Sequence, residues 1–209
     1  MSDGMPLPGV VVIGRGTASA PPDLVRVDLA AEAAAESVQH ALDHATVGLS
    51  RMRSALLDGG VQVDDLRTTE TTLREDHGPR GDRPLRYVAR LGLSAKVRDV
   101  ARAGAVVQNA LAEGGDTARL GGLYFELSDS TEQFTAARAA AFADALAKAR
   151  QYASLAGREL GEVISVDESA GGPAPLPRRQ AVAFAAADFP VDGGQQEIVA
   201  TVTLHWSWA

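Results

Sequence analysis

Two histidines at helical spacing are the first residues in this sequence that could bind a metal ion. His40 and His44, in the segment HALDH, stand four positions apart, which can place two imidazoles on one side of a helix. The apolar residues of the same segment, Val38, Leu42 and Ala45, fall on the opposite side of that helix. The glutamate of a zincin motif is missing from the second position. We therefore expect solvent-exposed histidines rather than a metal site.

A charged loop holds the third histidine. The segment EDHGPRGDRP begins with Glu75, Asp76 and His77. Its acids do not have the spacing of a calcium loop, and mixed charge in a loop rich in Gly and Pro usually serves solvation. The other charged residues of the segment are Arg80, Asp82 and Arg83. We expect a solvated loop.

The fourth histidine lies in the last expected strand. His205 shares the polar side of that strand with Thr201 and Thr203. No GxSxG segment marks a serine nucleophile that this histidine would activate. The pattern favours a surface or interface histidine. A cryptic hydrolase that uses His205 or the Asp76–His77 loop stays open as the least favoured alternative.

A Gly-x-Gly segment near the N-terminus could cradle a phosphate group. In IGRGTASAPPD, Gly14 and Gly16 follow a short apolar strand. The dinucleotide-binding fingerprint needs a third glycine and a helix directly after it. Here Pro21, Pro22 and a further strand follow instead. We expect a hairpin bend at the two glycines.

The composition narrows the classes of function. The 209 residues include no cysteine, which excludes disulfides, thiolate nucleophiles and cysteine-ligated metals. A formal charge of −7 and scattered arginines argue against a nucleic-acid binder. The N-terminal residues lack the basic and apolar regions of a signal peptide, and no window has the roughly 20 apolar residues of a membrane span. We expect a soluble cytoplasmic protein without a cofactor.

The hydrophobic periodicity predicts an α+β fold, with long, largely antiparallel strands and about three helices packed on the sheet. Apolar residues alternate where we expect strands and recur every three or four positions where we expect helices. The order is strands 10–16 and 24–32, helix 37–56, strands 66–74 and 85–97, helix 99–112, strand 117–127, helix 130–156, and strands 160–167 and 198–208. We expect a single domain over residues 1–209.

The third expected helix has an unusual composition. Ser130 and Gln133 have the spacing of a capping box, which predicts the start of the helix, and Gly157 predicts its end. Its many alanines leave little side-chain bulk, so that another backbone can approach closely. They are Ala136, Ala137, Ala140, Ala141, Ala145 and Ala149. We expect this helix to pack tightly on a sheet or on a copy of itself.

Residues 170–190 read as a long irregular loop that carries apolar side chains. Val182, Phe184 and Phe189 should not be left in water, so the loop either folds back over the sheet or covers another subunit. Trp206 and Trp208 share the apolar side of the last strand. Core packing is their default role, and an edge position would make them an interface anchor. These five residues are our candidate oligomer interface.

Five segments, in order along the chain, carry a family resemblance. They are GRGTASAPPDLVRVDLA, LLDGGVQVDDLRTTETTLRED, LRYVARLGLSAKVRDV, the long run from GGLYFELSDS to GEVISVDES, and PVDGGQQEIVATVTLHW. Their order and spacing resemble the SIMPL-domain family, also catalogued as domain of unknown function 541. Two features depart from the family pattern. Arg86 stands before Tyr87 where the family usually has glycine, and the signal peptide of most members is missing.

The resemblance implies a role rather than a reaction. The family has no accepted enzymatic activity and no agreed catalytic residues. Its members are associated with stress tolerance and with the cell envelope, are mostly periplasmic or secreted, and in some cases assemble into large homo-oligomers. We therefore expect a non-enzymatic, homo-oligomeric protein with a structural or stress-associated role. A module that binds a small molecule or a peptide between helix and sheet is the alternative.

Overall fold

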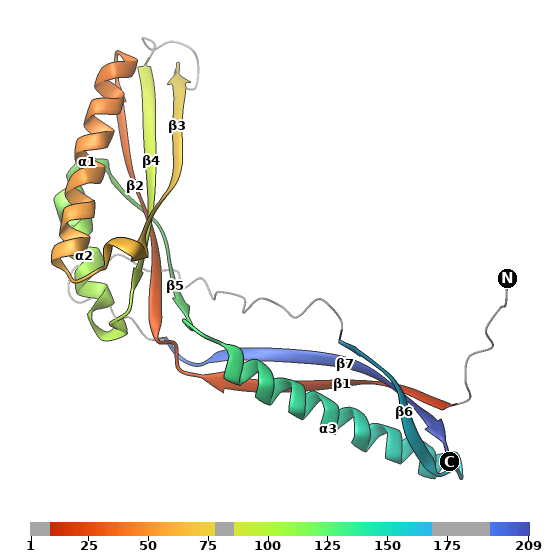
Figure 1. Cartoon of the computed structure of the whole chain (residues 1–209). Coiled ribbons are helices and arrows are strands. Elements are labelled where there is room, and N and C mark those ends of the chain that lie inside the picture. Colours follow the sequence, from red (N-terminus) through yellow and green to blue (C-terminus); the bar gives the residue numbers. More distant parts are fainter. Residues whose placement is uncertain (1–8, 78–85, 169–192) are drawn as a thin grey trace. The chain divides into compact units, whose positions relative to one another are not determined.

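The computed structural model describes residues 9–77, 86–168 and 193–209 (Figure 1). The order of elements is ββα ββα βα ββ, as the sequence predicts, and all strand pairs are antiparallel. The strands form two sheets, and contacts divide the chain into two compact units. Of the described residues, unit 1 comprises 9–21, 129–168 and 195–209, and unit 2 comprises 22–77, 86–128 and 193–194. The single domain stays a prediction.

Unit 1 is a three-stranded sheet with one helix on it. The strands β1 (Gly9–Ala20), β7 (Gln196–Trp208) and β6 (Leu160–Glu168) follow one another in the order β1-β7-β6. The helix α3 (Thr131–Leu155) packs chiefly on β1 and β7 and touches β6 only slightly (Figure 1). Val12 lies opposite Leu204, and both are buried on the side that α3 covers. We call this side the helix side, and the opposite side the open face.

Unit 2 is a four-stranded sheet with two helices on one face. Its strands are β2 (Leu24–Ala35), β3 (Leu66–Asp76), β4 (Arg86–Val97) and β5 (Ala118–Glu126), in the order β3-β4-β2-β5. The helices are α1 (Val38–Asp58) and α2 (Ala103–Gly114). Short 3₁₀ turns lie at Val63–Asp65, Val100–Arg102 and Gly115–Thr117. The two helices and the strands share one apolar core.

Helix α1 shows how the sequence builds unit 2. The Ser37 hydroxyl accepts a hydrogen bond from the His40 N–H, which satisfies one free donor at the helix start. Met52 and Leu56 are fully buried and pack in the core with Val27. After the helix the chain turns at Gly60, whose φ of 95° suits glycine.

Two local predictions were wrong. β1 continues to Ala20, so Gly14 and Gly16 lie inside a strand and not at a hairpin bend. Helix α3 begins at Thr131 as expected, but the Ser130 side chain makes no capping hydrogen bond. Instead the Thr131 N–H donates to the Asp129 carboxylate at 2.8 Å. Hydrogen bonds from the Thr131 side chain and from its N–H lower the pKa of Asp129. The capping box is therefore replaced by a cap from the preceding residue.

Several predicted features lie outside the described residues. They are the 170–190 loop with Val182, Phe184 and Phe189, and the charged-loop residues Arg80, Asp82 and Arg83. Among the helices that the structure describes, none has both the length and the hydropathy to cross a bilayer.

Candidate functional site

The contact between α3 and β1 is made of backbone and small side chains. Ala137, Ala141 and Ala145 are fully buried along the side of α3 that faces the sheet. A Cβ added at Gly14 would overlap the Ala141 carbonyl oxygen, and one added at Gly16 would overlap the carbonyl oxygen of Ala137. The alanine spacing thus serves close packing on a sheet, one of the two roles that the sequence predicts.

Because α3 lies so close, its polar side chains reach the outer edge of β1. The Arg15 N–H donates to the Asp144 carboxylate at 2.8 Å, and the Lys148 ammonium donates to the Ile13 carbonyl at 3.0 Å. Lys148 also bonds to Asp144 at 2.6 Å. The hydrogen bonds from Lys148 and from the Arg15 N–H lower the pKa of Asp144. One edge of the sheet is thereby capped within the chain.

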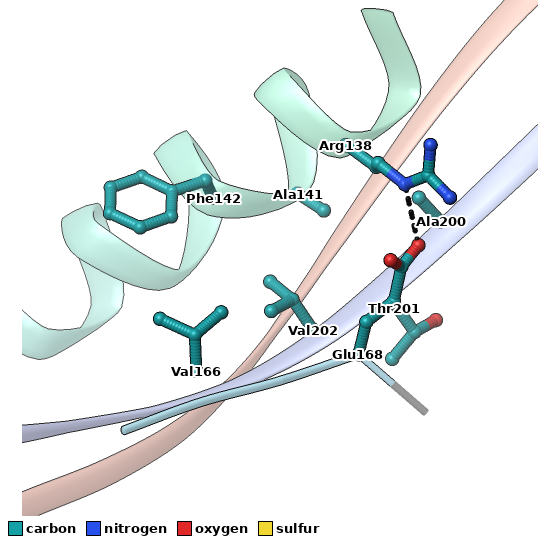
Figure 2. A pocket seen from close by; sticks show the side chains of 8 residues that line it. All are labelled: Arg138, Ala141, Phe142, Val166, Glu168, Ala200, Thr201 and Val202. Carbon is teal, nitrogen blue, oxygen red and sulfur yellow. Dashed lines mark hydrogen bonds and ion pairs between the residues drawn. The ribbon is translucent and has the colours of Figure 1, made fainter. Parts of the chain in front are cut away.

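The side of α3 toward β6 borders a hollow of about 140 Å³ (Figure 2). Phe142 of α3 and Val166 of β6 stand on either side of it, with Val202 of β7 between them. An ion pair closes one end, where Arg138 donates to Glu168 at 2.7 Å. The rest of the lining is Ala141, Ala200 and Thr201. This arrangement suits an apolar group with a polar neighbour.

The strand β6 is exposed along most of its length. Its residues from Glu162 to Glu168 are all exposed, and Val166 is 60% exposed although it is apolar. The phenyl ring of Phe142 is 40% exposed beside it. By contrast Trp206 of β7 is 2% exposed and packs edge-on against Phe142, with 6.3 Å between the ring centroids.

Residues 10–206 match the sequence profile of the family SIMPL, which is described as "Protein of unknown function (DUF541)". The chain belongs to the SIMPL family. Two curated relatives are both called "26 kDa periplasmic immunogenic protein", one from Brucella melitensis and one from Brucella abortus. Each is 24% identical over 175 residues, which cover 80% of this chain and 69% of the relative. Their names do not support the cytoplasmic location that we expected.

The two tryptophans of this SIMPL chain differ in environment. β7 is the central strand of its sheet, so the edge position that would favour an interface anchor does not arise. Trp206 is used in the core of unit 1, as the default interpretation had it. Trp208 is only partly buried, and its contact with another subunit stays a prediction.

The four histidines of the SIMPL chain lie on three different segments: α1, the end of β3 and β7. His40 and His44 are exposed on α1, and His205 is partly buried on the open face of unit 1. His77 is exposed and lies 3.4 Å from the Glu75 carboxylate. Among the residues that the structure describes, no three metal-ligating side chains gather.

Unit 2 carries a network of charges on the sheet face away from its helices. Arg26 bonds to Asp28 at 2.6 Å and to Glu126 at 2.7 Å, and it stacks over the Tyr124 ring at 4.2 Å. Burial by itself would lower the pKa of Arg26, but the hydrogen bonds to Glu126 and Asp28 outweigh this effect, and the pKa is raised. The Ser94 hydroxyl donates to Asp28. Since both carboxylates are already bonded to Arg26, we interpret this network as part of the sheet rather than as an ion-binding site.

A second hollow of unit 2, about 270 Å³, has basic side chains in its wall. Arg98 makes two hydrogen bonds of 2.8 Å to Asp65, and these bonds raise the pKa of Arg98. Lys96 and Arg102 line the same hollow. The nearly buried Asp65 is thus fully engaged with Arg98, and the pair joins the Val63–Asp65 turn to the end of β4.

The hollow beside α3 is the site that sequence reasoning missed. Phe142 is a large apolar residue among the alanines of α3, and β6 combines apolar and acidic residues in GEVISVDE. Both signals are present in the sequence. They indicate a site only when the position of α3 over β1 and β7 is known, because that position leaves β6 beside the helix.

Proposed function

We propose that this SIMPL protein acts in the periplasm by assembling with copies of itself, without catalysis. The periplasmic names of the relatives support the location. The family association with stress tolerance supports a structural, stress-associated role in the cell envelope.

The observation that carries the proposal is a pair of exposed apolar side chains, Val11 and Ile13, on the otherwise polar open face of unit 1. Val11 is 59% exposed, and Ile13 is similarly exposed on the same side of β1. Val199 of β7, opposite Thr17, adds a partly buried neighbour. Two such faces can pack together as sheets do in a sandwich, at a separation of about 10 Å. A second copy supplies a matching face, as a two-fold contact requires.

The sequence supplies the second part of the proposed interface. Val182, Phe184 and Phe189 are apolar residues of a long Pro-containing segment, and a neighbouring subunit would keep them from water. Trp208, partly buried at the end of β7, completes the candidate set.

The test is the mass of the full chain by light scattering after size exclusion. We expect a defined oligomer that becomes smaller in the double variant Val11→Asp, Ile13→Asp, because two charges would have to be buried at the interface. Deletion of residues 171–188 should also lower the mass.

The matched control is Val47→Asp on α1 of unit 2, which changes an apolar side chain of similar exposure. It should leave the mass unchanged. A monodisperse monomer at high protein concentration would contradict the proposal. A monomer in every variant would bring the alternative, a ligand- or peptide-binding module, to the front.

A further inference from the structure

The two edges of the unit 1 sheet are available to different degrees. A strand at a sheet edge directs every second backbone N–H and C=O outward, where another strand can pair with it. At β1, the Arg15 N–H and the Ile13 carbonyl are taken by Asp144 and Lys148. At β6, the Ser207 hydroxyl, which comes from the β7 side, bonds to both the Glu162 N–H and the Glu162 carbonyl. In the described part of the chain no side chain caps the outer edge of β6, so this edge can accept a partner strand.

The hollow lies over β6 and β7 on the helix side, which is the side to which a side chain opposite Val166 would point. Val166 lies opposite Leu204 in the register, so it points to the helix side, next to Phe142. A side chain opposite Val166 on a fourth strand would point to that same side. Apolar cavities of about 150 Å³ hold a group as large as benzene, so the hollow of about 140 Å³ accommodates one apolar side chain.

The charge of β6 defines the partner further. The strand contains Glu162, Asp167 and Glu168 and no lysine or arginine. Asp167 lies opposite Thr203, so it points to the open face, while Val166 beside it points to the helix side. A strand that pairs with β6 therefore meets the apolar Val166 on the helix side and the acidic Asp167 on the open face. Alternating apolar and basic residues fit this pattern.

We propose that β6 is an acceptor edge for an extended segment of another protein in which apolar residues alternate with lysine or arginine. The segment adds as a fourth strand beside β6, with one apolar side chain in the hollow and its basic side chains near Asp167. Main-chain hydrogen bonds provide affinity in such strand addition, and the pocket and charges provide specificity.

A second copy fits this edge less well. Two β6 strands would bring their carboxylates together, and of these carboxylates only that of Glu168 has a cationic partner among the described residues, Arg138. The β1 strand of another copy has its edge capped by its own α3. The inference differs from the proposed assembly in the residues it uses. Assembly uses Val11 and Ile13 of β1, whereas the acceptor site uses the outer edge of β6, the hollow and Asp167.

The test measures the binding of fluorescent peptides of about eight residues, a common strand length, to the full chain by anisotropy. A peptide of alternating lysine and valine should bind roughly tenfold more tightly than one of alternating glutamate and valine. Its affinity should also exceed that of a peptide of alternating lysine and serine by a similar factor, because the small polar serine side chain cannot fill the hollow. Equal affinities of the lysine–valine and lysine–serine peptides would show that binding depends only on non-specific charge attraction, and would overturn the inference.

Two variants locate the site. Val166→Ser should weaken the lysine–valine peptide at least about fivefold, and Val11→Ser, equally exposed on β1, should leave its binding unchanged. Circular dichroism checks that both variants fold. Equal effects of the two variants would overturn the inference. So would loss of peptide binding together with a fall in mass for Val166→Ser, since β6 would then hold a second copy. Tight binding of a peptide of residues 178–184, with no binding of the lysine–valine peptide, would assign the edge to a segment of this chain instead.

Discussion

The two outer strands of unit 1 belong to the same sheet but differ in how their outer edges are covered. β1 lies under α3, and the side chains of Asp144 and Lys148 bond to its outward backbone groups. β6 lies beside α3 and is exposed from Glu162 to Glu168. The position of one helix therefore decides which edge is closed and which can pair with another strand.

A third edge strand shows another way to protect an edge. β3 of unit 2 is also exposed along nearly its whole length. Its sequence, LRTTETTLRED, is polar and charged except at Leu66 and Leu73. Its pairing with β4 is interrupted between Thr68 and Thr71. Charge and an irregular register both discourage pairing with a further strand. β6 has three exposed large apolar residues, Val163, Ile164 and Val166, where β3 has one, Leu73.

The largest effect should come from removing the buried tryptophan of the central strand. Trp206→Ala would leave a cavity between β7 and α3, and we expect a loss of about 4 kcal/mol in the free energy of unfolding. Urea unfolding followed by tryptophan fluorescence measures this in unit 1, since both tryptophans lie in β7.

Trp208→Ala is the matched control. Trp208 is only partly buried, so its loss should cost less than half as much. Equal losses for the two variants would show that the burial of Trp206 does not distinguish it, and would contradict its role in the core.

A second variant, Gly14→Val, tests the difference between the two edges by displacing α3 from β1. In Gly14→Val the new side chain has to displace α3, which also removes the caps from the edge of β1. We expect a destabilisation of about 3 kcal/mol, at the upper end for overpacking. Thr17→Val, on the exposed open face of the same strand, should stay within about 0.5 kcal/mol of the wild type in the same urea experiment. A tolerated Gly14→Val would mean that α3 does not need to lie so close.

The smallest effect should be a pH dependence that belongs to the capped edge. Because the folded state lowers the pKa of Asp144, its ionised form stabilises the fold at pH values above its unfolded pKa, about 4. That contribution is lost as the pH falls through the lower, folded-state pKa. Asp144→Asn should therefore flatten the decline of the urea midpoint below about pH 4. Lys148→Met should flatten it partly, and a decline unchanged in both variants would contradict the cap.

The sequence predicted the elements and their order because hydrophobic periodicity is a local signal. It also predicted that the alanines of α3 allow close packing. It misread Gly14 and Gly16, because the reason for both glycines is a helix whose Asp144 lies 129 positions away from Arg15. The capping box failed for a local reason, since Asp129 competes with Ser130 for the first free N–H groups. Nothing in β6 alone revealed its exposure, which depends on where α3 lies.

The most direct test of the difference between the two edges is amide hydrogen exchange of the full chain, followed residue by residue by NMR. In the free protein we expect slow exchange at the Arg15 N–H and fast exchange at about every second amide of β6. Addition of the lysine–valine peptide should slow those β6 amides and leave Arg15 unchanged. Uniformly slow exchange along β6 in the free protein, or peptide protection that appears at β1, would contradict the account.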